Sequence, residues 1–114
     1  MHELCIVFHV IGGVEGTAAE NHLEKVSAVV LELGEVSGVV PDYLTDCWKW
    51  AAAKSETVSG AELRIETLPA VTHCDGCGTD YPTVAHGRTC PRCGSGSTWL
   101  LTGNEVNIKE IEGY

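Results

Sequence analysis

Two Cys-x-x-Cys pairs, separated by twelve residues, constrain what this chain can fold into more than any other feature of its sequence. The first pair is Cys74 and Cys77, the second is Cys90 and Cys93, and a glycine follows each pair. Two intervening residues let both sulfurs of a pair reach one ion at about 2.3 Å. The glycines accept the positive φ that turns backbone N–H groups toward the thiolates. The pattern therefore predicts one tetrahedral Zn²⁺ bound by four thiolates.

The alternative chemistry for the same cysteines is two disulfides, which would need an oxidising compartment. The chain starts with Met1-His2-Glu3, which has no cationic region, and the apolar run at residues 4–11 is short. We therefore expect neither a signal peptide nor a membrane span, but a cytoplasmic protein with reduced thiols. In that setting the two remaining cysteines are expected to be small core residues. They are Cys5 and Cys47.

The charge of the chain argues against a nucleic-acid partner. Sixteen Asp and Glu residues outnumber seven Lys and Arg residues, which gives a formal net charge of −9 at pH 7. Four thiolates around one dication would add two further negative charges. The predicted ribbon contains two basic residues, Arg88 and Arg92, which do not form the basic stripe that nucleic acid requires. In a chain of only 114 residues, a structural metal would contribute usefully to stability.

Apolar periodicity predicts the order helix, strand, helix, strand, zinc ribbon, strand. Glycines at positions 12, 13 and 16 weaken the first helix, so we expect it to be kinked or frayed. Pro41 suits the first position of the second helix. The expected elements are a helix from residue 3 to about 21, a strand at 25–35, a helix from 41 to about 54 and a strand at 61–68. A last strand is expected to start at residue 99, to be interrupted at 103–104 and to resume over 106–112.

This order predicts an α+β fold, with two helices packed on a three-stranded, mainly antiparallel sheet and an inserted zinc-ribbon module. Residues 1–69 plus 98–114 would form the α/β domain, and residues 70–97 would form the ribbon between the last two strands. The edge strand of such a sheet could pair between chains, which leaves monomer, homodimer and swapped dimer open.

The N-terminus carries a second set of metal-binding groups. The Met1 amine and the His2 amide nitrogen would close a five-membered chelate ring, and the His2 imidazole Nδ1 would close a six-membered ring. Three nitrogens in one plane favour Ni(II) or Cu(II) over zinc. A backbone nitrogen or the carboxylate of Glu3, or a water molecule, would fill the fourth position. On the residues alone, a solvated histidine with no metal role is the competing interpretation.

Several motifs together resemble one family, the hydrogenase nickel-incorporation proteins of the HypA/HybF type. The opening Met1-His2-Glu3-Leu4 is similar to the start of that family. The block at residues 29–41, the Gly60-Ala61-Glu62-Leu63 segment and the two cysteine knuckles follow in the family's order. Departures from the pattern are the three glycines of the first helix and Cys5 beside the proposed nickel site.

The resemblance implies a nickel metallochaperone. Such a protein would receive Ni(II) and deliver it to the large-subunit precursor of [NiFe]-hydrogenase, working with a nickel-binding GTPase accessory protein. Urease maturation is a known additional role in the family. His2 would be the essential nickel ligand, with the Met1 amine beside it and Glu3 near or in the coordination shell. Nickel would be the transferable ion, and the zinc held by the four cysteines would be structural.

Two other functional classes compete with this interpretation. One is a zinc-ribbon adaptor that binds other proteins and carries no transferable metal. The other is a dithiol oxidoreductase that uses Cys90 and Cys93, although four cysteines in knuckle form favour metal. The sequence contains no Ser-His-Asp set, phosphate loop or paired acidic constellation, so we expect no enzymatic turnover. His73 and His86 are expected to be exposed loop residues, with replacement of a zinc thiolate as the alternative.

Overall fold

A computed structural model describes residues 3–114 of the chain, and its contacts divide the chain into two units. The first unit comprises the residues up to 32, 39–66 and 107–114, and the second comprises 33–38 and 67–106. The elements in chain order are α1 (Glu3–Glu20), β1 (Val26–Gly34), α2 (Pro41–Ala52), β2 (Glu62–Leu68), β3 (Val71–Cys74), β4 (Asp80–Pro82), α3 (Thr83–His86), β5 (Thr98–Thr102) and β6 (Val106–Gly113). Within residues 3–114, no helix is both long and apolar enough to cross a membrane.

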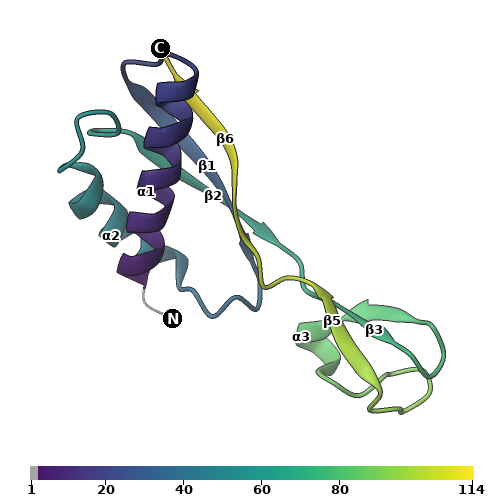
Figure 1. The fold of residues 1–114 in the computed structure, drawn as a ribbon. Helices are drawn as coiled ribbons and strands as arrows, with labels where there is room; N and C mark the ends of the chain where they lie inside the picture. The colour runs from purple at the N-terminus through teal and green to yellow at the C-terminus, as the bar shows by residue number, and fades with distance from the viewer. Residues whose placement is uncertain (1–2) are drawn as a thin grey trace. The chain divides into compact units, whose positions relative to one another are not determined.

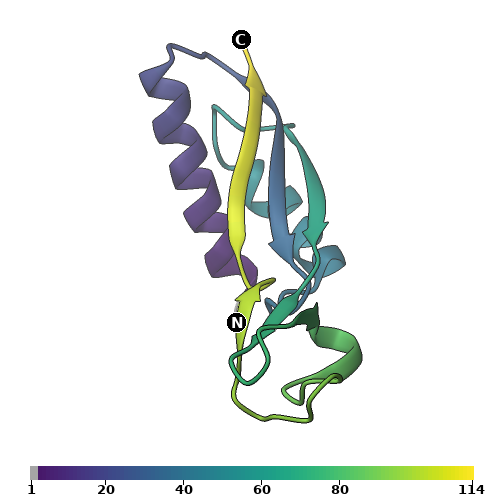
Figure 2. The same ribbon diagram turned by 90° about the vertical axis from the view of Figure 1, so that its right-hand side faces the viewer.

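The first unit is an α/β layer built on a three-stranded sheet with the order β2-β1-β6. Both α1 and α2 lie on one face of this sheet (Figure 1). Strand β2 runs parallel to β1 and β6 runs antiparallel to it (Figure 2). The parallel pair follows from the α2 crossover, because parallel neighbours cannot be joined by a tight hairpin. The expected α+β class, with two helices on a three-stranded sheet, is confirmed.

The core of this unit lies between the central strand and the two helices. Seven of the nine residues of β1 are buried, as expected for a strand with neighbours on both sides. In α2, Leu44 and Trp48 are fully enclosed, and the Trp48 Nε1–H donates to the backbone oxygen of Ala61 at 2.9 Å. That hydrogen bond satisfies the polar atom of a buried indole and connects α2 to the residue that precedes β2.

Helix α1 is continuous from Glu3 to Glu20, so the expectation of a kinked or frayed helix is wrong. A Cβ added at Gly12 or Gly16 would meet nothing within 4 Å, and one at Gly13 would make an ordinary contact with Ile108 at 3.4 Å. Burial of an apolar stripe outweighs the low helix propensity of these glycines. The buried residues of α1 are Val7, Val10, Ile11, Val14 and Ala18.

Exposed charged side chains of β2 and β6 pair with one another. Arg64 bonds Glu62 at 3.1 Å and Glu112 at 2.6 Å, and Lys109 bonds Glu66 at 2.7 Å. Ion pairs this exposed contribute little to stability. These pairs make the exposed surfaces of β2 and β6 polar.

The second unit contains its own antiparallel sheet, with the order β4-β3-β5. Strand β3 pairs with β5 from Cys74 opposite Thr98 to Val71 opposite Thr102, with an irregularity between Val71 and Thr72. Residues 98–106 thus group with the cysteine segment by their contacts, whereas the sequence pattern predicts that 98–114 belong to the α/β domain.

Three backbone segments meet closely in the second unit. A Cβ added at Gly34 would lie 2.0 Å from the Gly103 oxygen, and one at Gly103 would lie 2.4 Å from the Ala70 Cα. The Ala70 N–H donates to the Glu35 carboxylate at 2.9 Å, and the Val36 N–H donates to the Gly103 oxygen at 2.9 Å. Glycine is required where backbones approach this closely. The segment after β1 is therefore part of the unit that holds the cysteines.

Candidate metal centres

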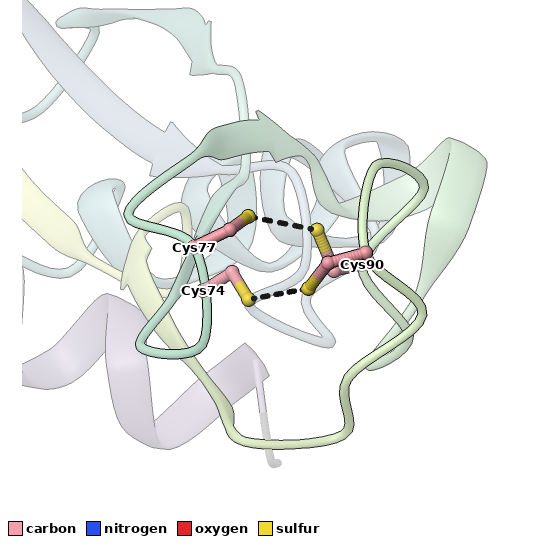
Figure 3. A group of neighbouring side chains, drawn as sticks. Cys74, Cys77 and Cys90 are labelled. Atoms are coloured by element: carbon pink, nitrogen blue, oxygen red, sulfur yellow. Dashed lines mark hydrogen bonds between the residues drawn. The ribbon is translucent and has the colours of Figure 1, made fainter.

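The four cysteines of the two knuckles come together in the second unit, as their spacing predicts. Their sulfurs all lie within 4.8 Å of one another, with Cys74 and Cys93 at 3.6 Å and Cys77 and Cys90 at 3.6 Å. Figure 3 shows Cys74, Cys77 and Cys90 directed toward one another from two loops. A tetrahedral ion with bonds of about 2.3 Å separates its sulfurs by about 3.8 Å, whereas a disulfide needs about 2.05 Å. The geometry fits a Zn(Cys)₄ site and does not fit two disulfides.

The backbone of the two knuckles follows the same pattern twice. The Cys74 N–H donates to the Thr79 oxygen and the Gly78 N–H donates to the Cys74 oxygen, at 2.9 and 2.8 Å. In the second knuckle the corresponding bonds join Cys90 to Ser95 and Gly94 to Cys90, at 3.0 and 2.9 Å. Gly78 and Gly94 have φ of 76° and 74°, which non-glycine residues rarely adopt. The glycine after each pair is thus needed for the knuckle to turn.

Hydrogen bonds around the sulfurs divide the thiols into easily and less easily ionised groups. The hydroxyl and N–H of Thr79 lower the pKa of Cys77 to about 6. The N–H groups of Cys93 and Arg92 lower the pKa of Cys90. The Ser95 N–H also lowers the pKa of Cys93. The neighbouring Cys74 thiol and desolvation act in the opposite direction and outweigh it, so the pKa of Cys93 is raised to about 11. A dication at the centre would favour the thiolate form of all four.

The cluster is partly enclosed by its own unit. Cys74 and Cys90 are buried with Tyr81, and the Tyr81 hydroxyl donates to the Gly87 oxygen at 2.9 Å. Arg92 donates to the Thr79 hydroxyl oxygen at 3.3 Å, and that oxygen lies 3.2 Å from the Cys77 sulfur. Four thiolates leave no open coordination position, which is typical of a structural rather than a catalytic zinc site.

The contacts to Thr79 and Arg92 were not expected from the sequence. Ligand spacing identifies the groups that touch the ion, but not the residues that orient those ligands. The position of Thr79, two residues after the second ligand of its knuckle, is the one signal that could have indicated its role.

Neither histidine near the ribbon belongs to the four-ligand cluster. His73 lies on β3, with Nδ1 at 2.6 Å from Asp80 and Nε2 at 3.6 Å from Asp75. His86 ends α3, exposed, with its ring edge-on to Tyr81 at a centroid distance of 5.9 Å. His73 is therefore a half-buried strand residue rather than the exposed loop residue that was expected.

The proposed nickel ligands lie at the very start of the chain. Met1 and His2 fall outside the described residues. Glu3 is the first residue of α1 and provides a carboxylate in its first turn. Cys5 is exposed and Cys47 is half-buried, so the expectation that both are core residues is wrong. The exposure of Cys5 places a thiol on the first turns of α1.

Comparison with known proteins covers nearly the whole chain. The family model described as HypA, hydrogenase/urease nickel incorporation metallochaperone, matches residues 1–113. The hydrogenase maturation factor HypA of Chlorobium phaeobacteroides is 39% identical over 111 residues, which are 97% of each chain. The protein of the same name from Geobacter metallireducens is 36% identical over 112 residues, 98% of each chain.

The fold is similar to that of a solved structure. The solution structure of the Ni metallochaperone HypA from Helicobacter pylori superposes with a TM-score of 0.78 at 24% sequence identity, over 99% of this chain and 97% of that one. The likeness covers both the layered unit and the cysteine unit. Sequence and fold agree: this chain belongs to the HypA family of hydrogenase/urease nickel-incorporation metallochaperones.

Proposed function

We propose that this protein binds Ni(II) through the Met1 amine and the His2 nitrogens, with Glu3 near or in the coordination shell, and delivers it for [NiFe]-hydrogenase maturation. The observation that carries the proposal is the combination of Met1-His2-Glu3 with a four-cysteine cluster in a chain that matches the family over residues 1–113. The two sites would have different roles: the four-cysteine site would hold a structural ion, and the N-terminal site would carry the transferable one. A closed thiolate site exchanges its ion slowly, whereas a chelate of few ligands can load and release one.

The partners in this proposal are a nickel-binding GTPase accessory protein and the hydrogenase large-subunit precursor. A net charge of −9 suits the handling of divalent cations and contact with basic patches on partners. Cytoplasmic location and the absence of catalytic turnover are parts of the same proposal. A homodimer through an edge strand of the first sheet, β2 or β6, is compatible with the strand order.

The test is a nickel titration on untagged, zinc-loaded protein. His2→Ala is expected to weaken nickel binding by at least about 100-fold, because even loss of an outer-shell partner costs up to about that much in metal affinity. His9→Ala is the matched control, because His9 is an exposed histidine farther along α1. Zinc should remain at one ion per chain in both variants.

Blocking the amine with an N-terminal extension should reproduce the His2→Ala result. Nickel affinity should also fall as the pH is lowered, since the amine, imidazole and amide must release protons to bind the ion. Undiminished nickel affinity in both the His2→Ala and the extended protein would refute the proposal.

A further inference from the structure

The second unit contains a cavity that the cysteine cluster does not use. Its volume is about 530 Å³. No cysteine lines it, and neither does any of the sixteen Asp and Glu residues of the chain. Its lining includes Thr72, Thr83, Arg88, Thr98 and Trp99.

Arg88 is one of the residues that line this cavity, and its side chain is exposed. Within residues 3–114, the Arg88 guanidinium has no hydrogen-bond, ion-pair or ring partner, whereas Arg64 and Lys109 form ion pairs and Arg92 bonds Thr79. The Arg92 guanidinium thus contacts Thr79 of the first knuckle, whereas no such contact to the knuckles is made by the Arg88 guanidinium. A guanidinium has five N–H donors and no acceptor, so a free one at a cavity without acidic residues favours an anionic ligand group.

Hydroxyl groups add a further donor. The Thr72 and Thr83 hydroxyl oxygens lie 2.6 Å apart, and Thr72 is almost fully buried. One of the two hydroxyls donates to the other, which leaves one hydroxyl hydrogen of the pair available to a ligand. The Thr98 hydroxyl is already used, since it donates to the Arg88 backbone oxygen at 2.7 Å.

Strand β5 provides an edge beside the cavity. The strand order β4-β3-β5 leaves one side of β5 without a neighbour in its sheet. Trp99 and Leu101 are 49% and 47% exposed, and side chains two apart on a strand share a face. An open edge with exposed apolar side chains is the surface to which an extended peptide adds as a further strand.

We propose that β5 and this cavity bind an extended segment of a partner protein that carries a carboxylate side chain. The backbone of the segment would pair with the edge of β5, its apolar side chains would cover Trp99 and Leu101, and its carboxylate would accept hydrogen bonds from Arg88. The proposal is independent of nickel binding, because none of these residues lies within the proposed nickel site.

The test uses the full, zinc-loaded, ¹⁵N-labelled chain and two synthetic peptides. The probe is acetyl-Thr-Val-Glu-Val-Thr-amide, and its neutral counterpart has Gln in place of Glu. The indole N–H signal of Trp99 should shift and saturate with the Glu peptide. The signals of Trp48 and Trp50, which belong to the other unit, should not move. The Gln peptide should bind at least about tenfold more weakly, since it loses a charge-assisted hydrogen bond.

Arg88→Gln should weaken binding of the Glu peptide by a similar factor. Lys49→Gln is the matched control, because Lys49 is an exposed cation of α2 whose loss changes the net charge equally. The zinc content of both variants is measured, so that loss of the fold is distinguished from loss of the binding group.

Four outcomes would each overturn the proposal. They are no saturable shift of Trp99, equal binding of the Gln peptide, equal weakening by Lys49→Gln, and binding of acetate as tight as that of the Glu peptide. The last would show that the cavity takes a small carboxylate and not a protein segment.

Discussion

Glu105 organises the turn that joins β5 to β6. Its carboxylate accepts hydrogen bonds from the Thr102 hydroxyl and the Gly103 N–H, both at 2.5 Å, and from the Asn104 N–H at 2.8 Å. The Thr102 hydroxyl, followed by the Gly103 N–H, lowers the pKa of Glu105 below its ordinary value. A lowered pKa in the folded state means that the ionised carboxylate stabilises the fold. This stabilisation is complete above the unfolded pKa of about 4.3 and is lost as the pH falls through the folded pKa.

Glu105→Gln is therefore expected to lower the urea midpoint of unfolding at pH 7. The deficit should stay constant from pH 7 to about pH 5 and shrink below about pH 4.3, where the carboxylate protonates first in the unfolded chain and then, at its lowered pKa, in the folded protein. Glu110→Gln is the control, since the Glu110 carboxylate caps no turn. Zinc content is measured at each pH to separate metal loss from carboxyl protonation. A deficit that does not change with pH would contradict the assigned role of the carboxylate.

Thr79 is expected to favour the thiolate form of Cys77 in the folded zinc unit, because its hydroxyl and N–H lower the pKa of Cys77 to about 6. Thr79→Val removes the hydroxyl, which is the larger of these two contributions. The variant should bind zinc about 10- to 100-fold more weakly, as expected when a group that orients a metal ligand is lost. Competition with a chromophoric chelator at pH 7 measures the zinc affinity. Equal zinc affinity in both proteins would show that Thr79 does not tune Cys77.

At the scale of elements, the boundaries of the first unit were largely predictable from the sequence. Strands β1 and β2 and the start of α2 lie within a few residues of their expected limits, because each carries a clear period or a helix-starting proline. Strands β3 and β4 were missed, since they are four and three residues long and show no period. Their pairing depends on contacts between distant parts of the ribbon.

The burial of α1 was predicted less well than its existence. Leu4 and Phe8 recur at helical spacing with Val7, Ile11 and Val14, which predicts burial, yet they are 37% and 49% exposed. Phe8 instead packs edge-on to Trp50 at a centroid distance of 6.3 Å, and Trp50 is itself exposed. Helical spacing identifies a stripe, but the neighbouring helix decides which edge of that stripe becomes buried.

Two glycine-to-alanine variants should have opposite effects. Gly12→Ala should raise the free energy of unfolding by up to about 1 kcal/mol, because it improves helix propensity and meets no neighbour. Gly34→Ala should lower it by at least about 2 kcal/mol, because the new Cβ would overlap the Gly103 backbone. Urea unfolding at pH 7 measures both. An unchanged free energy of unfolding in Gly34→Ala would mean that the Gly34 and Gly103 backbones can move apart without cost.

At the scale of the whole molecule, the two metal proposals fall in different units. Glu3 belongs to the layered unit and the four cysteines to the other. The layered unit has an extensive apolar core, whereas the buried cluster around the cysteines consists of Cys74, Cys90 and Tyr81. A unit with so small a core needs another source of stability, which a bound metal would supply.

Zinc removal should therefore unfold the second unit selectively. After chelation, amide signals of residues 67–106 should lose their dispersion, while those of α1 and β1 keep theirs. Cys93→Ser should reproduce this result, and Cys5→Ser, which alters a thiol outside the cluster, should keep one zinc per chain. Full dispersion in the metal-free protein would show that the zinc is not structural. The cysteine spacing alone sufficed to predict that the four sulfurs lie together. It did not predict how small the buried cluster around them is.

The close backbone crossing limits how the cysteine module could be transplanted into another protein. A graft made of residues 67–106 would omit Glu35 and Val36, and so leave the Ala70 N–H and the Gly103 oxygen without their hydrogen-bond partners. The surface beneath Gly34 would also be uncovered. A graft that carries residues 33–38 on a short linker should fold with zinc, although those residues precede residue 67 by 29 to 34 positions in the chain.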